Sequence, residues 1–174
     1  MSPVFADSSS IILLHKAGLF DRTVARLFLV FSPSVYRELT RPGYPGADLF
    51  MQAVGTGRIQ IFSPAKPVTP LPEPGLNLLD KGEKETLSLF LEYRSGFILT
   101  DDGQAARFCK KNGLPFINAL LIPKLFQYAG YGSRIQVDQQ MKTISSLGRY
   151  SDRVKKIARA LGPDDLARFI KEVK

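Results

Sequence analysis

Short apolar runs with no polar residue inside them recur along this chain, and helical patterns separate them. Residues 28–31, Phe-Leu-Val-Phe, are the clearest example, since a parallel strand that is buried on both faces needs such an uninterrupted run. Further strands are predicted at residues 4–6, 97–100 and 114–117, and an alternating one, suited to a sheet edge, at 58–62. This order of elements predicts a three-layer α/β/α fold around a central, mainly parallel sheet.

The helices between these strands have recognisable beginnings and ends. Ser32 is a predicted cap, and Pro33 takes the first helical position, where proline is favoured because it has no amide proton to satisfy. Gly18 and Gly113 end two other helical patterns. Helices are predicted at residues 8–17, around 24–27, and at 33–39, 47–54, 79–93, 104–111 and 118–128.

A proline-rich stretch interrupts the pattern at residues 63–75. Its five prolines, at positions 64, 67, 70, 72 and 74, deny hydrogen bonds to helix and sheet alike. We expect an extended connector that crosses one face of the domain.

The chain has 174 residues, 44% of them hydrophobic, which is enough for a full core. We expect an α/β domain over residues 1–133 and a helical extension over 134–174, with helices at 135–147, 152–161 and 164–173. No apolar run approaches the roughly 20 residues of a membrane span. The first residues lack the basic and apolar pattern of an export signal. A cytoplasmic protein with no membrane partner is therefore expected.

The single cysteine and the single histidine exclude two classes of site. Cys109 alone can form neither an intramolecular disulfide nor a thiolate zinc cage, and its helical context predicts a buried structural thiol. His15 ends an apolar run and is predicted to lie on a helix surface rather than to act as a general base.

Four acidic residues stand where an apolar run ends or a helix begins: Asp7, Glu38, Glu83 and Asp101. Because the carboxyl ends of parallel strands meet at one edge of a sheet, these side chains can converge in one cleft. Carboxylates suit Mg²⁺ or Mn²⁺, hard cations that keep positions open for water and phosphate. Hydrolysis of phosphodiester bonds is the predicted chemistry, because such a metal ion activates water and offsets developing negative charge.

Each acid also has a structural interpretation. Asp7 can cap the helix that follows it, and Asp101 and Asp102 can favour the positive end of the next helix. Glu38 can be an exposed helix residue. A small shift in register would exchange Glu83 for Glu85, and Glu83 is the one we predict.

Positive charge is concentrated in the extension. Residues 1–133 hold 14 basic and 11 acidic side chains, whereas the much shorter stretch 134–174 holds 10 and 5. The basic residues can contact nucleic-acid phosphates, form a solvated helix face or line a dimer interface. The candidates for nucleic-acid contact are Arg149, Arg153, Lys155, Lys156 and Arg159.

Four segments together resemble the PIN domain family in order and spacing: VFADSSSI at 4–11, SVYREL at 34–39, GEKET at 82–86 and FILTDD at 97–102. The resemblance covers residues 3–132 and implies a metal-dependent endoribonuclease, as in the toxins of toxin–antitoxin pairs. It implies Asp7, Glu38, Glu83 and Asp101 as catalytic metal ligands, with Asp102 holding a metal-bound water.

The resemblance also implies supporting residues and partners. Ser9 matches a hydroxyl that hydrogen-bonds within the acidic cluster, and Asn118 falls at a polar position that faces the same cleft. Mg²⁺ or Mn²⁺ would be the cofactor and RNA the substrate. An antitoxin protein and a second copy of the chain, in a homodimer, would be the partners.

Two other functions fit parts of the sequence. One is a catalytically inactive PIN-fold module that binds nucleic acid or protein. The other is a phosphotransferase or phosphatase that uses Asp7 as its nucleophile, but that class usually carries a second aspartate two residues later, where this chain has Ser9.

Overall fold

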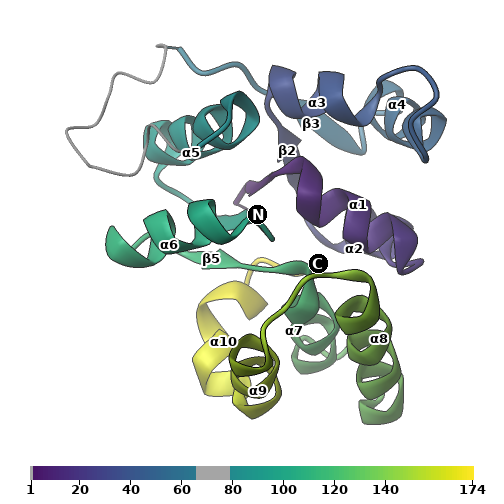
Figure 1. Ribbon diagram of the computed structural model, residues 1–174, viewed down its shortest axis with the longest axis vertical. Coiled ribbons are helices and arrows are strands. Elements are labelled where there is room, and N and C mark those ends of the chain that lie inside the picture. The colour runs from purple at the N-terminus through teal and green to yellow at the C-terminus, as the bar shows by residue number, and fades with distance from the viewer. Residues whose placement is uncertain (1, 66–78) are drawn as a thin grey trace.

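The computed structural model describes residues 2–65 and 79–174 (Figure 1). Its five strands form one sheet in the order β3-β2-β1-β4-β5, and every neighbouring pair is parallel. All five strands predicted from the apolar runs are present, and the three-layer α/β/α fold is confirmed. The strands are β1 (Val4–Ala6), β2 (Leu29–Phe31), β3 (Ile59–Ile61), β4 (Phe97–Leu99) and β5 (Phe116–Ile117).

Both faces of the sheet are covered by helices, and Figure 1 shows α5 and α6 on the side opposite α1 and α2. Phe5, Val30 and Ile98 point to the α5–α6 side, where they pack with residues such as Leu89 and Phe108. The alternate strand residues enter the larger core on the other side. Two-sided burial explains why β1, β2 and β4 contain no polar residue, whereas the edge strand β3 contains Gln60.

The strand order creates a crevice at one edge of the sheet. The chain runs from β1 to β2 and β3, then returns to place β4 on the other side of β1. In open parallel sheets, ligands bind at the carboxyl ends of the strands where the order reverses in this way. That point lies between the ends of β1 and β4, immediately before Asp7 and Asp101.

The helices of the α/β part begin at residues that suit them. Asp7 caps α1, Ser32 caps α3 ahead of Pro33, Asp80 caps α5 and Asp102 caps α6. The segment predicted as one helix from Asn118 begins instead as a 3₁₀ turn, η2, before α7. The bounds are α1 Ser8–Lys16, α2 Phe20–Arg26, α3 Pro33–Leu39, α4 Ala47–Gly55, α5 Lys81–Tyr93, α6 Gly103–Lys111, η2 Ala119–Leu121 and α7 Ile122–Tyr128.

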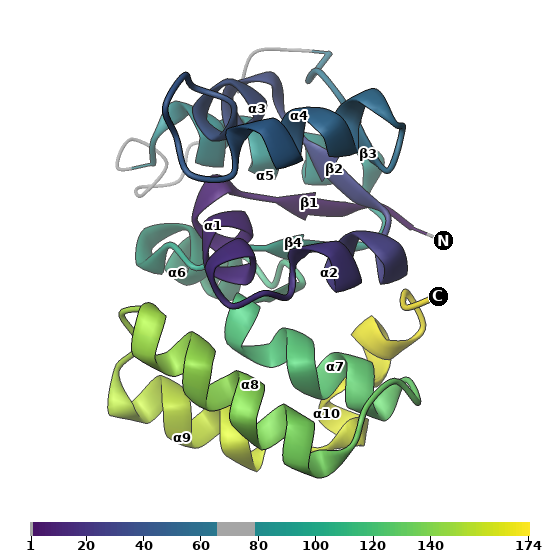
Figure 2. The same ribbon diagram turned by 90° about the vertical axis from the view of Figure 1, so that its right-hand side faces the viewer.

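The extension after residue 133 is helical, as predicted, with α8 (Arg134–Leu147), α9 (Asp152–Ala160) and α10 (Pro163–Ile170). Figure 2 shows these helices stacked with α7 beside the sheet. Val137, Ile144, Ala158 and Leu166 belong to the same hydrophobic core as β1 and β2. The extension therefore packs onto the α/β part through a shared core.

A buried lysine joins α7 to the end of α9. The ammonium group of Lys124 donates hydrogen bonds to the carbonyl oxygens of Arg159 at 2.6 Å and Leu161 at 2.7 Å. Cations at a helix carboxyl end satisfy carbonyl groups that lack intrahelical partners. The end of the chain is also held, because the Ser2 backbone amide donates to Glu172 at 2.9 Å.

Most of the predicted proline-rich connector, from residue 66 onward, lies outside the described residues. Among the described helices, none is long and apolar enough to cross a membrane. Cys109 is fully buried on α6, as predicted, and His15 lies with the edge of its ring against Phe50.

Candidate active site

Asp7 is held rigidly at the end of β1. Its carboxylate accepts hydrogen bonds from the Ser10 backbone amide at 2.9 Å, from the Ser9 hydroxyl at 2.9 Å and from the Thr100 hydroxyl. Burial raises the pKa of Asp7 to about 6, although these hydrogen bonds oppose the shift. Asp7 is thus both the cap of α1 and an acid whose negative charge is costly in the absence of a cation.

Asp7 lines a pocket of about 230 Å³ with four other acidic residues, and we call it the acidic pocket. The carboxylates come from the end of β1, from α3, from the first turn and cap of α5, and from the cap of α6. The hydroxyls of Ser8 and Ser9 also line it. The five acids are Asp7, Glu38, Asp80, Glu83 and Asp102.

Glu83 and Asp80 form a reciprocal cap at the start of α5. The Glu83 backbone amide donates to Asp80 at 2.8 Å, and the Asp80 amide donates to the Glu83 carboxylate at 2.9 Å. Partial burial, together with the carboxylates of Asp80 and Asp102, raises the pKa of Glu83 to about 7, although its hydrogen bond from Asp80 opposes the shift. Crowded carboxylates of this kind gain from a shared cation.

Glu85, the alternative to Glu83, lies outside the acidic pocket. Its carboxylate accepts from the Ser34 backbone amide at 2.9 Å and from the Ser34 hydroxyl at 2.7 Å. Although partial burial opposes it, these bonds lower the pKa of Glu85. Glu85 therefore joins α5 to α3, and it is Glu83 that faces the other acids.

Glu38 lies at the mouth of the acidic pocket on the exposed side of α3. The Ser8 hydroxyl donates to its carboxylate at 2.8 Å. This contact holds Glu38 next to the first turn of α1, so the side chain is oriented although it remains solvent-accessible.

The two aspartates after β4 lie in different surroundings. Asp102 lines the acidic pocket, and one of its oxygens accepts from the amides of Gln104 at 2.6 Å and Ala105 at 2.8 Å. Asp101 does not line that pocket. The carboxylate of Asp101 is nevertheless close enough to Asp7 for its negative charge to contribute to the raised pKa of Asp7, although only Asp102 of the two lines this pocket.

Asp101 faces the extension instead. It accepts from the Ser10 hydroxyl at 2.8 Å, from the Ala119 amide at 2.9 Å and from the hydroxyl of Tyr150. Burial raises the pKa of Asp101, and these three donors oppose the shift. Asp101 therefore connects α1, η2 and the segment between α8 and α9.

The two supporting residues differ in their placement. Ser9 contacts Asp7 and lines the acidic pocket, where the resemblance placed it. Asn118 does not line that pocket. In the part of the chain that the structure describes, the Asn118 side-chain oxygen is buried without a hydrogen-bond partner.

Three residues of the site were missed in the sequence. Asp80 had a signal, because it stands three residues before Glu83 in the spacing of a capping box. Thr100 ends the predicted strand at 97–100, but no pattern indicated that its hydroxyl would donate to Asp7. Tyr150 had no local signal, since only the packing of the extension brings it to Asp101.

The donors of the acidic pocket suit a hard divalent cation in their chemistry. All five acids offer carboxylate oxygens, and the environment of Asp7 and Glu83 raises the pKa of both. Within residues 2–65 and 79–174, however, no three acidic, histidine or cysteine side chains are already arranged to hold a metal ion. To bind an ion, Glu38 and Glu83 would have to turn carboxylate oxygens toward it from their present hydrogen bonds with Ser8 and Asp80.

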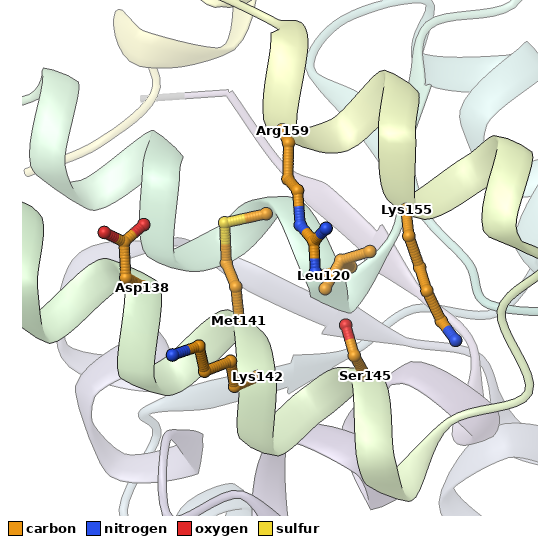
Figure 3. Close-up of a pocket in the computed structure, with 7 residues that line it drawn as sticks. All are labelled: Leu120, Asp138, Met141, Lys142, Ser145, Lys155 and Arg159. Carbon is orange, nitrogen blue, oxygen red and sulfur yellow. The ribbon is translucent and has the colours of Figure 1, made fainter.

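The five basic candidates of the extension fall into three groups. Arg149 lines a hollow of about 270 Å³ beside the acidic pocket, which we call the linker hollow, with Ile12, Leu147, Tyr150 and other residues. Lys155 and Arg159 line a second hollow of about 320 Å³ between α8 and α9, the basic hollow, with Leu120, Asp138, Met141, Lys142 and Ser145 (Figure 3). Arg153 and Lys156 are exposed on α9 and line neither hollow.

A family model described as a PIN domain matches residues 3–157. No match was found among curated proteins. The matched segment extends beyond the α/β part to include α8 and most of α9.

Proposed function

The chain belongs to the PIN domain family, and we propose that it is a metal-dependent endoribonuclease that hydrolyses RNA phosphodiester bonds. The acidic pocket supports this proposal best. It gathers five carboxylates from four separate elements at the edge of the sheet where ligands of such folds bind. PIN domains are generally nucleases, and our proposal adds the dependence on a metal ion and the RNA substrate.

The donor set identifies the residues that would hold the metal. We assign Asp7, Glu83 and Asp102 to this role, with Glu38 and Asp80 completing the shell from the mouth of the pocket. Bound Mg²⁺ or Mn²⁺ would supply an acidified water and stabilise the charge that develops on the phosphate. We assign Asp101, predicted as a ligand, a supporting role instead, because it accepts a hydrogen bond from Ser10 and does not line the acidic pocket.

The chain's own residues then have distinct tasks. Three hydrogen bonds to the Asp7 carboxylate fix the orientation of this side chain. Ser8 orients Glu38. Burial and the neighbouring carboxylates raise the pKa of Glu83 to about 7, so this side chain would release its proton when a cation binds near neutral pH.

Partners and location complete the proposal. RNA is the substrate class, and an antitoxin protein and a second copy of the chain are the protein partners that the family resemblance suggests. The cytoplasm remains the expected location. A role as the toxin of a toxin–antitoxin pair rests on the resemblance alone.

The test is cleavage of a labelled tRNA or total-RNA pool by the purified protein with Mn²⁺, with Mn²⁺ plus EDTA, and with the variant Asp7→Asn. The matched control is Asp48→Asn, which removes an exposed acid in the first turn of α4. We expect cleavage by the wild type and by Asp48→Asn with Mn²⁺, and none with EDTA or with Asp7→Asn.

Two results would contradict the proposal. Cleavage that survives EDTA or the Asp7→Asn substitution would exclude the metal-dependent mechanism. An absence of cleavage with every divalent metal, in a protein that still binds RNA, would favour the inactive binding module.

A further inference from the structure

Two hollows of the extension join into one groove along α8. The first is the basic hollow, and the second, of about 290 Å³, lies between α7 and α8. Asp138 and Arg159 line both of them, so the two hollows are continuous. We call their union the α8 groove. The second hollow adds Lys124, Gln127, Tyr128, Arg134 and Val137 to the lining.

The α8 groove follows one face of α8 along most of that helix. Its α8 residues are three or four positions apart, the spacing of neighbours on one helix face. From residue 134 to residue 145 an α-helix rises about 16 Å. Hollows of about 300 Å³ are at the lower end of the size of small-molecule sites, and two that join can hold an elongated ligand.

The α8 groove is separate from the acidic pocket. Among the residues that the structure describes, none lines both. Leu147, which lines the linker hollow beside that pocket, follows Asp138 by nine positions on α8. At about 100° per residue, the two side chains lie on opposite faces of the helix. A ligand in the groove is therefore distinct from a substrate held by the acids.

Cations gather at one end of the α8 groove. Lys142 and Lys155 line the basic hollow from α8 and α9. Figure 3 shows Arg159 extending from α9 toward α8, with the Ser145 hydroxyl directed toward it. An arginine, two lysines and a hydroxyl supply the donors that phosphate oxygens accept.

The other end of the groove has groups suited to a nucleobase. Tyr128 and Val137 provide apolar surface there, and the hydroxyl of Tyr128 is held by the Leu161 carbonyl oxygen at 3.2 Å. Gln127 offers an amide and Arg134 a guanidinium group. Side-chain amides hydrogen-bond to base edges, and arginine and aromatic side chains stack on base faces.

Asp138 stands where the two hollows meet. A carboxylate at such a point repels phosphate but can accept hydrogen bonds from ribose hydroxyls, as an acidic residue does in many dinucleotide-binding folds. Cations, a carboxylate, and an amide with an aromatic ring thus follow one another along the groove. Phosphates, ribose and base follow one another in the same order in a nucleotide.

The fold leaves most of these polar groups unused. Within residues 2–65 and 79–174, six lining side chains have no hydrogen bond or ion pair: Gln127, Arg134, Asp138, Lys142, Ser145 and Arg159. Lys155 pairs with the exposed Asp152 at 3.7 Å. The buried Lys124 instead binds the Arg159 carbonyl oxygen at 2.6 Å, which fixes this end of α9 against α7.

From these observations we propose that the α8 groove binds a free nucleoside polyphosphate. The phosphates lie at Lys142, Lys155 and Arg159, the ribose at Asp138 and the base beside Tyr128. The inference goes beyond the proposed function and does not depend on it, because the acidic pocket contributes no residue to the groove.

Isothermal titration of the wild-type protein with ATP, GTP and inorganic triphosphate tests the proposal. EDTA is present, so that no divalent metal ion carries a nucleotide to the acidic pocket. We expect the better of the two nucleotides to bind about tenfold more tightly than triphosphate, since the base and ribose add contacts. Arg159→Glu should weaken its binding by about tenfold or more.

Arg153→Glu is the matched control, because it makes the same charge change on α9 at a residue that lines neither hollow. It should weaken nucleotide binding by less than about threefold. Circular dichroism of each variant checks that it folds.

The role of Asp138 has its own test. The better nucleotide should bind the wild type about tenfold more tightly than its 2′,3′-dideoxy form, which has no ribose hydroxyl to donate. Asp138→Ala should bind the two forms about equally, because the acceptor is gone. A cationic surface that only attracts charge would not distinguish the two forms in either protein.

Four results would overturn the proposal: no binding of either nucleotide, triphosphate binding as tightly as the nucleotide, equal losses for Arg153→Glu and Arg159→Glu, or a preference for the ribose hydroxyls that persists in Asp138→Ala. An RNA oligonucleotide that binds through Arg159 when neither nucleotide does would assign the groove to a nucleic-acid backbone instead. RNA cleavage with Mn²⁺ is a separate measurement, so its failure would leave these titrations unchanged.

Discussion

The hydroxyl of Tyr150 donates a hydrogen bond to the carboxylate of Asp101, across 49 residues of sequence. Asp101 directly precedes Asp102, which lines the acidic pocket, and its second oxygen accepts from Ser10 on α1. The extension is therefore connected through a single hydrogen bond to the aspartate pair after β4. Because of this contact, we expect changes in the packing of the extension to alter the position of Asp101 and, through it, the acidic pocket.

Replacing Tyr150 with Phe should destabilise the protein by about 1–3 kcal/mol, because it removes one donor from a largely buried carboxylate. Urea denaturation measures the change. Tyr128→Phe is the matched control, since its hydroxyl donates to the carbonyl oxygen of Leu161, a neutral acceptor, at 3.2 Å. A loss for Tyr150→Phe no larger than that for Tyr128→Phe would show that the contact with Asp101 adds no stability.

Asp102→Asn and Asp101→Asn should separate the two roles of this aspartate pair. Asparagine caps helices as well as aspartate does, so Asp102→Asn should preserve α6 while removing a carboxylate from the acidic pocket. We expect RNA cleavage with Mn²⁺ to fall about 100-fold or more for Asp102→Asn. For Asp101→Asn the loss should be less than about tenfold, because that side chain acts on the pocket only through its neighbours. Single-turnover rates measure both variants, and the reverse order would return Asp101 to the role of metal ligand.

The sequence predicted the sheet well because burial on both faces requires an uninterrupted apolar run in the central strands, and burial on one face gives the alternating pattern of β3. It also predicted that Asp7, Glu38 and Glu83 would meet, since parallel strands bring their carboxyl ends to one edge. The choice between Asp101 and Asp102 was beyond it. Which of the two residues lines the acidic pocket depends on how the backbone turns from β4 into α6. Both residues are aspartates, so residue type could not decide between them.

Contacts made by the extension were the least predictable part of the site. Residues 134–174 showed their helices through apolar periodicity and caps. The direction in which Tyr150 points depends on how α8 packs against α1 and α7, and a local sequence pattern does not predict that packing. For the same reason, the sequence did not predict that Lys142 and Arg159, which lie on different helices, would line one hollow.

Asp7→Asn should stabilise the metal-free protein at high pH. Burial raises the pKa of Asp7 from 3.8 to about 6, so the folded state holds the proton more tightly than the unfolded state does. Wild-type stability should therefore fall as pH rises from about 4 through 6, by up to about 3 kcal/mol for a shift of this size. Urea denaturation in EDTA at pH 4, 6 and 8 should show Asp7→Asn gaining on the wild type across that window. Mn²⁺ should raise the melting temperature of the wild type only, and an Asp7→Asn protein that is less stable than wild type at pH 8 would contradict the account.

Glu83→Gln and Glu85→Gln should have opposite effects, although the two residues lie two positions apart on α5. Glutamine preserves the capping box at position 83, so Glu83→Gln should leave stability nearly unchanged while weakening Mn²⁺ binding by about 10- to 100-fold. Glu85→Gln should leave Mn²⁺ binding unchanged and lower stability by about 1–2 kcal/mol, since it removes the charged acceptor for the Ser34 amide and hydroxyl. Isothermal titration with Mn²⁺ and urea denaturation measure the two quantities on both variants. If Glu85→Gln weakened Mn²⁺ binding and Glu83→Gln did not, the register of α5 in the active protein would differ from that in the structure, because only one of the two can face Asp7.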